Sequence, residues 1–442
     1  MSTPAATGAG ATTPAPRAAA SWATPAGVTA ALGHPLAAAG LGRSVGLVVL
    51  DPATGATLLS RDGGRDFTPA STVKLLTATA ALDLLGPAHR FRTRVEVAGV
   101  TGGIVHLVLV GGGDPSLTRA VAGQALSGEA AADPVVDPAR LPVLVSRTVA
   151  GLRARGVTPG NGAVTVAVDD HLFTGPATAV GWVSSYVDGG SVGPVDSLSL
   201  DGGRRGPATA ARVVDPARSA GDAFAAALLD AGISVAAGDR TVGPRRRPVG
   251  PLSAAATTLA AVDSPRLVDL LHHLLLASDN DYAETLARDV AVAVGRPADF
   301  TGSAAAVLDT IAGLGIDTSG AVLLDGSGLS RRDRLSPLLV ARVVALTVRD
   351  PALVAVPRNL PVAGRSGTLA TRFTGAAARA RGRVRAKTGT LDGVDTLAGF
   401  VRTDSAGQLV VVVLADATPG TDAARSAIDV LVARLVGCGC RG

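Results

Sequence analysis

Five short strand-like runs lie near the two ends of the chain, and they restrict its fold more than any other feature. The first two, residues 44–50 and 56–60, are separated by a short turn that contains Pro and Gly, which is typical of a hairpin. The other three, residues 383–389, 396–401 and 409–414, follow one another near the C-terminus. Together they predict one five-stranded antiparallel sheet that both ends of the chain build, so that the middle of the chain is an insertion.

The length of 442 residues is large for a single hydrophobic core and favours more than one domain. We therefore expect residues 34–93 and 264–442 to share the five-stranded sheet, with residues 94–263 as an inserted domain. Helix patterns that would flank the sheet lie near residues 71–85, 267–276, 283–294 and 421–436. The insertion combines strand-like residues 92–97 and 104–110 with helix patterns near 141–155 and 217–231. The predicted fold class is mixed α/β (α+β).

Composition excludes several classes of protein. Apolar residues make up 47% of the chain but aromatic residues only 2%, so the core must consist of Ala, Val and Leu. The net charge of +5 comes from arginines that are spread along the sequence, which is typical of a solvated surface and not of a nucleic-acid-binding patch. The six histidines show no metal-ligand spacing, so we expect no metal and no cofactor.

The two ends of the chain have unusual sequences. Residues 1–33 are rich in Ala, Thr and Pro and predict a disordered linker. No signal peptide is visible, and no apolar stretch approaches the length of a membrane-spanning helix. Cys438 and Cys440, the two cysteines, are spaced too closely for an easy mutual disulfide and read as part of a tail.

Lysine occurs twice, at Lys74 and Lys387, whereas the other 39 basic residues are arginine. A lysine can lose its proton when it is buried, and an arginine effectively cannot. Lys74 closes a Ser-x-x-Lys motif that begins at Ser71, and Lys387 opens a Lys-Thr-Gly motif. Between them lies Ser278-Asp279-Asn280, a Ser-x-Asn motif, in a chain with three asparagines. The three motifs in this order indicate an acylating serine enzyme.

The sequence around Ser71 is consistent with a nucleophile. Thr68-Pro69 predicts a helix start, and Gly86 predicts its end. Ser71 and Lys74 would then lie one turn apart on one face, where the amine can reach the hydroxyl. Burial favours a neutral amine, which can act as a general base. The alternative is an ordinary surface helix start.

The Lys387 segment predicts a strand at the edge of the sheet, where an extended peptide can pair with the backbone. Gly389 would let a substrate approach closely, and Lys387 would supply positive charge for a carboxylate.

These motifs resemble the D-alanyl-D-alanine carboxypeptidase/endopeptidase family, the low-molecular-mass penicillin-binding proteins of class C type with inserted domains. The resemblance covers roughly residues 40–436. It includes further family signatures in the expected order: Gly112-Gly113-Asp114-Pro115, Val168-Asp169-Asp170, Gly181-Trp182, Asp325-Gly326-Ser327-Gly328 and Ser366-Gly367-Thr368. The family implies a penicillin-binding/serine β-lactamase-like transpeptidase fold, an extracytoplasmic location in the cell envelope or outside it, and peptidoglycan stem peptides and β-lactams as partners.

The resemblance also implies residue roles. Ser71 would attack the carbonyl between two terminal D-alanines, and Lys74 would take its proton. Ser278 would pass a proton to the leaving amine, and Asn280 would hold Lys74 and substrate. The substrate carboxylate would bind Lys387, Thr388, Gly389 and Thr390, and the N–H groups of Ser71 and Thr390 would form the oxyanion hole.

Two further residues, Asp114 and Arg331, are candidates for binding the side chain of the third residue of the stem peptide, when that side chain carries an ammonium and a carboxylate. Both lie in Gly-rich turns, where Asp and Arg are equally often structural. The two interpretations are left open.

Two other functions remain as alternatives. A serine β-lactamase carries the same three motifs, although about 200 residues separate Lys74 from Ser278 here, and no Glu-containing deacylation loop is recognisable. A non-catalytic peptidoglycan-binding scaffold would not need Ser71 and Lys74. The sequence does not decide the balance of carboxypeptidase and endopeptidase activity.

Overall fold

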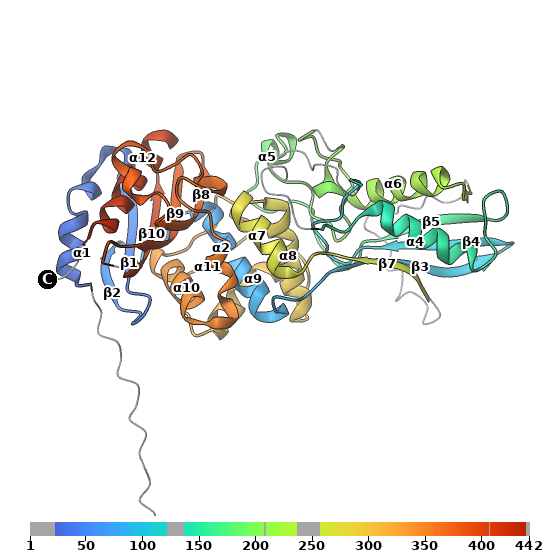
Figure 1. Ribbon diagram of the computed structural model, residues 1–442, viewed down its shortest axis with the longest axis horizontal. Coiled ribbons are helices and arrows are strands. Elements are labelled where there is room, and N and C mark those ends of the chain that lie inside the picture. The colour runs from blue at the N-terminus through green and yellow to red at the C-terminus, as the bar shows by residue number, and fades with distance from the viewer. Residues whose placement is uncertain (1–22, 122–136, 207–208, 237–256, 406, 439–442) are drawn as a thin grey trace, which may run out of the picture.

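Two five-stranded sheets lie at opposite ends of an elongated molecule, with a group of helices between them (Figure 1). This computed structural model describes residues 23–121, 137–206, 209–236, 257–405 and 407–438.

The first sheet has the strand order β2-β1-β10-β9-β8, and all neighbours are antiparallel. Its strands are β1 (Ser44–Leu50), β2 (Thr57–Arg61), β8 (Val384–Leu391), β9 (Val394–Arg402) and β10 (Gln408–Asp416). Strand β1 pairs with β10 along its whole length, with Ser44 opposite Asp416. The predicted sheet, built from both ends of the chain, is therefore confirmed.

The first sheet is covered by helices on both faces, which explains why its central strands are almost continuously apolar. Val410 and Val412 belong to one core with α2 (Val73–Leu85) and α10 (Pro337–Arg349). Val411 and Val413, one residue further along, belong to a second core with α12 (Thr421–Val436). Alternate residues of a strand face opposite sides, so both faces of β10 are buried.

Helix α1 (Pro25–Leu32) corrects the expectation of a linker up to residue 33. Thr24 caps the helix by accepting a hydrogen bond from the backbone N–H of Gly27, and Pro25 occupies its first turn. Val28 and Leu32, four residues apart, are both buried in the core that α12 shares. The cap and the apolar pair were not recognised in the sequence because the surrounding residues are rich in Ala and Pro. Residues 1–22 lie outside the described residues.

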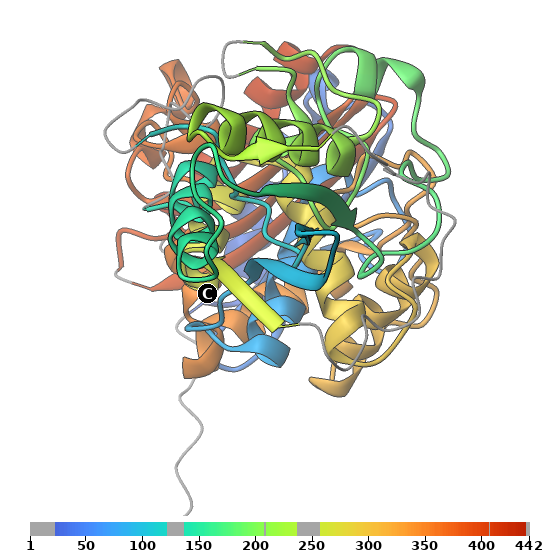
Figure 2. The same cartoon turned by 90° about the vertical axis from the view of Figure 1, so that its right-hand side faces the viewer.

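The second sheet has the order β6-β5-β4-β3-β7. Its strands are β3 (Arg92–Thr101), β4 (Ile104–Val110), β5 (Ala163–Asp169), β6 (Ser234–Val235) and β7 (Thr257–Asp263). Helices α4 (Leu141–Arg153) and α6 (Pro216–Asp230) share a core with this sheet. Figure 2, which looks along the molecule from this end, shows both helices on one side of the strands. The expected strands and helices of the insertion are present.

Further helices and short 3-10 turns complete the described part of the fold. They are α5 (Ser184–Asp188), α7 (Leu267–Ala277), α8 (Asn280–Ala293), α9 (Phe300–Gly313) and α11 (Ala355–Arg358), with short 3-10 turns at Pro35–Ala37, Ala39–Leu41, Ala70–Thr72, Asp201–Gly203, Pro351–Leu353, Gly367–Leu369 and Gly375–Ala380. Within the described ranges, no helix is both long enough and apolar enough to span a membrane.

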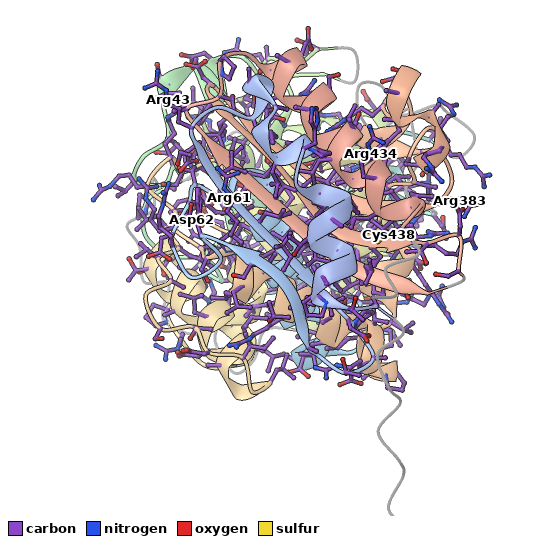
Figure 3. All side chains as sticks on the ribbon, turned by 90° about the vertical axis from the view of Figure 1, so that its left-hand side faces the viewer. Arg43, Arg61, Asp62, Arg383, Arg434 and Cys438 are labelled. Carbon is purple, nitrogen blue, oxygen red and sulfur yellow. The ribbon has the colours of Figure 1, made fainter. Side chains whose placement is uncertain are left out.

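Cys438 lies just after α12, and its Sγ is 3.6 Å from the backbone oxygen of Gly27 in α1 (Figure 3). Cys438 is in a disulfide. The chain has one other cysteine, Cys440, which falls outside the described residues. The close spacing argued against a disulfide between the two cysteines, whereas Cys438 is disulfide-bonded in the structure.

Candidate active site

Ser71 lies in a 3-10 turn, Ala70–Thr72, that leads directly into α2. The α-helix begins at Val73, later than the start predicted at Thr68-Pro69, because Pro69 precedes a 3-10 turn and does not begin the α-helix. The Nζ of Lys74 lies 2.9 Å from the Oγ of Ser71, so the predicted contact between the two is present. The Lys74 side chain is completely buried.

Lys74 contacts two further oxygens. Its Nζ lies 2.7 Å from the Oδ1 of Asn280 and 2.8 Å from the backbone oxygen of Ser327. The amide and carbonyl oxygens accept hydrogen bonds and cannot donate them. They orient two N–H bonds of Lys74 away from Ser71, so a neutral amine would direct its lone pair at the Ser71 hydroxyl.

The Ser-x-Asn motif forms the junction between α7 and α8. Ser278 ends α7 in a left-handed conformation with φ 62°, which is uncommon for a residue with a side chain. Asp279 caps α8 by accepting from the backbone N–H of Tyr282, and its other oxygen lies 3.2 Å from the Nε2 of His273. These contacts fix the turn that brings Ser278 and Asn280 to the same place.

Lys387 lies on β8, and its Nζ donates to the Oγ of Ser278 at 2.7 Å and to the backbone oxygen of Thr388 at 2.8 Å. The side chain is completely buried. The structure thus brings all three motifs together, with the Ser-x-Asn turn between the two lysines.

Gly389 is required by the protein itself. A Cβ at this position would lie 2.8 Å from the backbone nitrogen of Ser71 and 2.3 Å from the Oγ1 of Thr396. The expectation assigned this close approach to a substrate, whereas in the structure the turn that carries Ser71 approaches β8.

The loop Asp325–Arg331 contains functional contacts that sequence reasoning did not assign. Both oxygens of the buried Glu284 accept from its backbone, from Gly326 N at 3.0 Å and Ser327 N at 2.9 Å. Burial, and then the charge of Asp325, raise the pKa of Glu284 to about 8. Glu284 therefore holds the backbone N–H of Ser327, the residue whose carbonyl contacts Lys74. Its position on α8, four residues after Asn280, was a signal that could have suggested it.

A cleft of about 770 Å³ opens in front of Ser71. It is lined by Ser278, Asn280, Thr388 and Thr390, together with residues between β5 and β6 such as Tyr186 and Ser191. The Nδ2 of Asn280 donates to the backbone oxygen of Ser191 at 2.9 Å. The segment from Val183 to Ser191 therefore forms part of the wall of the cleft.

The two candidates for side-chain recognition separate in the structure. Arg331 lines the cleft, and its Nη2 donates to the backbone oxygen of Asp392 at 2.8 Å. Asp114 is buried outside the cleft lining, where its Oδ1 accepts from the N–H and the hydroxyl of Ser116. Burial raises the pKa of Asp114 to about 6. The geometry supports the structural interpretation of Asp114, because its carboxylate closes its own turn.

Two arginines of the cleft, Arg372 and Arg425, were not predicted. Arginine is so frequent in this chain that neither stands out by residue type. Across the described ranges, no group of three or more His, Cys, Asp or Glu side chains is placed to hold a metal ion.

The fold and the arrangement of the three motifs define a class, the penicillin-binding serine enzymes. The profile of the D-Ala-D-Ala carboxypeptidase 3 (S13) family matches residues 28–211 and 205–435. The chain belongs to this family, and it is accordingly a peptidase of the D-Ala-D-Ala carboxypeptidase type.

Relatives agree with this assignment. Carboxypeptidase DacB of Mycolicibacterium smegmatis is 39% identical over 420 residues, which cover 94% of this chain and 85% of that protein. A D-alanyl-D-alanine carboxypeptidase of an Actinomadura species is 34% identical over 409 residues, which cover 80% of this chain and 74% of that protein.

The solved structures show the fold. Penicillin binding protein 4 (dacB) from Haemophilus influenzae superposes with a TM-score of 0.70 at 21% identity, over 93% of this chain and 97% of that one. The same protein complexed with a β-lactam gives a TM-score of 0.63 over the same shares. The expected penicillin-binding fold is therefore confirmed.

Proposed function

We propose that this carboxypeptidase removes the terminal D-alanine of peptidoglycan stem peptides through an acyl-enzyme on Ser71. The observation that carries the proposal is the buried Lys74 amine, 2.9 Å from the Ser71 hydroxyl at the floor of the cleft. In the described site, this amine is the group placed to take the hydroxyl proton.

The first half-reaction forms an ester. Ser71 Oγ attacks the carbonyl carbon of the penultimate D-alanine while its proton passes to Lys74. The C–N bond then breaks, and Ser278 relays the proton that Lys74 accepted to the leaving amine of the terminal D-alanine; the Oγ of Ser278 lies 2.7 Å from the Lys387 Nζ. The N–H groups of Ser71 and Thr390 would stabilise the oxyanion.

The second half-reaction is hydrolysis of the ester by water, which returns Ser71 and releases the shortened peptide. A cross-link whose amide follows D-alanine would be cut by the same steps, as endopeptidase activity. A β-lactam would acylate Ser71, but its amine would stay attached to the acyl group and would not leave the site. We place the enzyme outside the cytoplasm because its substrate is the cell wall.

We also propose that residues 94–263 form a domain inserted between residues 34–93 and 264–442. The strands of the second sheet fall almost entirely within these bounds, from Arg92 to Asp263, and they have a hydrophobic core of their own.

The experiment is intact-protein mass spectrometry after benzylpenicillin, with peptide mapping. We expect a single adduct on Ser71 that is absent in Ser71→Ala, and hydrolysis of a peptide ending in D-Ala-D-Ala by the unmodified enzyme. An adduct that persists in Ser71→Ala would refute the assignment of the nucleophile. Rapid loss of the adduct, with no peptide hydrolysis, would instead indicate a β-lactamase.

A further inference from the structure

The end of the cleft beyond the Lys-Thr-Gly strand is formed by α12. Arg425, in the second turn of this helix, lines the cleft, and its Nη2 donates to the Oγ1 of Thr390 at 3.2 Å. The Arg425 side chain is 42% exposed, although its Nε lies near the carboxylate of Asp395. A guanidinium is thus presented to the cleft beside a residue of the motif that should bind a carboxylate.

The donors of Arg425 are only partly used. Its Nε lies 3.7 Å from the Oδ1 of Asp395, a loose ion pair, and Asp395 also accepts from the hydroxyls of Thr390 and Thr418. An arginine has five N–H donors in one plane, so a planar anion in the cleft could still take two of them side by side.

Arg372, a second arginine that lines the cleft, is held by Asp429. Its Nη2 and Nε contact the two oxygens of Asp429, at 2.6 and 3.3 Å, and its side chain is 12% exposed. Its Nη2 also donates to the backbone oxygen of Arg425 at 3.3 Å. Arg372 therefore fixes the turn of α12 that carries Arg425.

Lys387 is a poor candidate for direct contact with a substrate. Its ammonium is completely buried and bonded to Ser278 and to the backbone of Thr388. Its charge can favour an anion nearby, but its ammonium is engaged by the Ser278 hydroxyl and by the backbone of Thr388. The hydroxyls of Thr388 and Thr390 line the cleft, and they need a cationic partner that also faces it.

We infer that Arg425 is that partner: it binds the carboxylate at the end of the substrate with a charged hydrogen bond, next to Thr388 and Thr390. The inference rests on the proposed function and names a specificity residue that lies outside the three motifs. In this arrangement the two cations have different roles: Lys387 holds the turn at Ser278, and Arg425 contacts the substrate carboxylate.

The test compares two thioester acyl donors that share the same N-acyl-D-alanyl group. One has thioglycolate as its leaving group, and the other has thioglycolamide, so they differ only in a carboxylate against a carboxamide. For Arg425→Ala we expect kcat/KM to fall about 10- to 100-fold with the carboxylate donor, the range of a charged hydrogen bond. With the carboxamide donor we expect a change of less than about threefold. Arg425→Lys should show an intermediate loss, because it keeps the charge without the planar fork.

Arg434→Ala is the matched control, because Arg434 lies on the same helix with its side chain on the outside of the molecule (Figure 3). The Arg434→Ala variant should leave kcat/KM unchanged for both donors. Thermal unfolding checks that every variant is folded. Equal losses of Arg425→Ala on both donors would overturn the inference, since Arg425 would then only position Thr390. No loss on either donor would overturn it as well. The proposed function fails separately, if the unmodified enzyme forms no acyl adduct on Ser71 with either donor.

Discussion

The two lysines allow one matched comparison, replacement of each by arginine. Both side chains are completely buried and hydrogen-bonded, so both variants must fit a larger group into a closed site. Overpacking of this kind costs about 1–3 kcal/mol of folding free energy. This cost is common to Lys74→Arg and Lys387→Arg, so it cancels when the two variants are compared.

The chemical consequences differ. Lys74 must accept the proton of Ser71, and a guanidinium cannot, so Lys74→Arg loses the general base. That loss typically slows a reaction by ~10²–10⁴-fold, or about 3–5 kcal/mol in the activation barrier. Lys387 donates to Ser278 Oγ and the backbone of Thr388, and arginine can also donate. Lys387→Arg should therefore lose about tenfold in acylation, from misfit alone.

The assay is the second-order rate of acylation by benzylpenicillin, measured across pH, with thermal unfolding to show that both variants are folded. In the unmodified enzyme the rate should rise with pH as the base becomes neutral. The residual rate of Lys74→Arg should not follow this profile. Equal rates for the two folded variants would show that Lys74 does not act as the proton acceptor.

Two further predictions concern buried carboxyl groups. The pKa of Glu284 is raised to about 8, so between about pH 4.5 and pH 8 the folded state keeps a proton that the unfolded state has lost. As the pH rises through this interval, the free energy of unfolding should fall by about 1.4 kcal/mol per pH unit. Denaturant unfolding at several pH values should show a shallower fall in Glu284→Gln, and parallel curves would contradict the raised pKa. Asp114→Ala should lower thermal stability, and it should change kcat/KM equally for stem peptides with a zwitterionic and an aliphatic third residue, because Asp114 bonds to Ser116 outside the cleft. A selective loss on the zwitterionic peptide would restore its role in recognition.

The sheet could be predicted because its signals are local. Apolar runs of strand length, a hairpin turn and the rarity of lysine are all visible without knowledge of the fold, and the helix expected at residues 421–436 matches the observed bounds of α12. Helix α1 was missed because its buried pair, Val28 and Leu32, lies in an Ala-rich segment and becomes meaningful only against α12.

The unpredicted site residues depend on tertiary packing. Arg425 reaches Thr390 because α12 packs across β9, and nothing in the sequence distinguishes it from the other arginines. Glu284 acts through a loop more than 40 residues away, which α8 meets only in the folded protein. For Asp114 the sequence leaves both interpretations open, and its hydrogen bond from Ser116 favours the structural one.

The pairing of β1 with β10 has a consequence for biosynthesis. Ser71 is translated early, but the strand that holds β1 in the sheet ends at Asp416, and Lys387 comes shortly before it. A ribosome-bound chain that stops short of β10 has its nucleophile and lacks the partner of β1. Such long-range pairing also makes folding slow. The sheet that carries Lys387 can therefore be completed around β1 only after β10 has been synthesised.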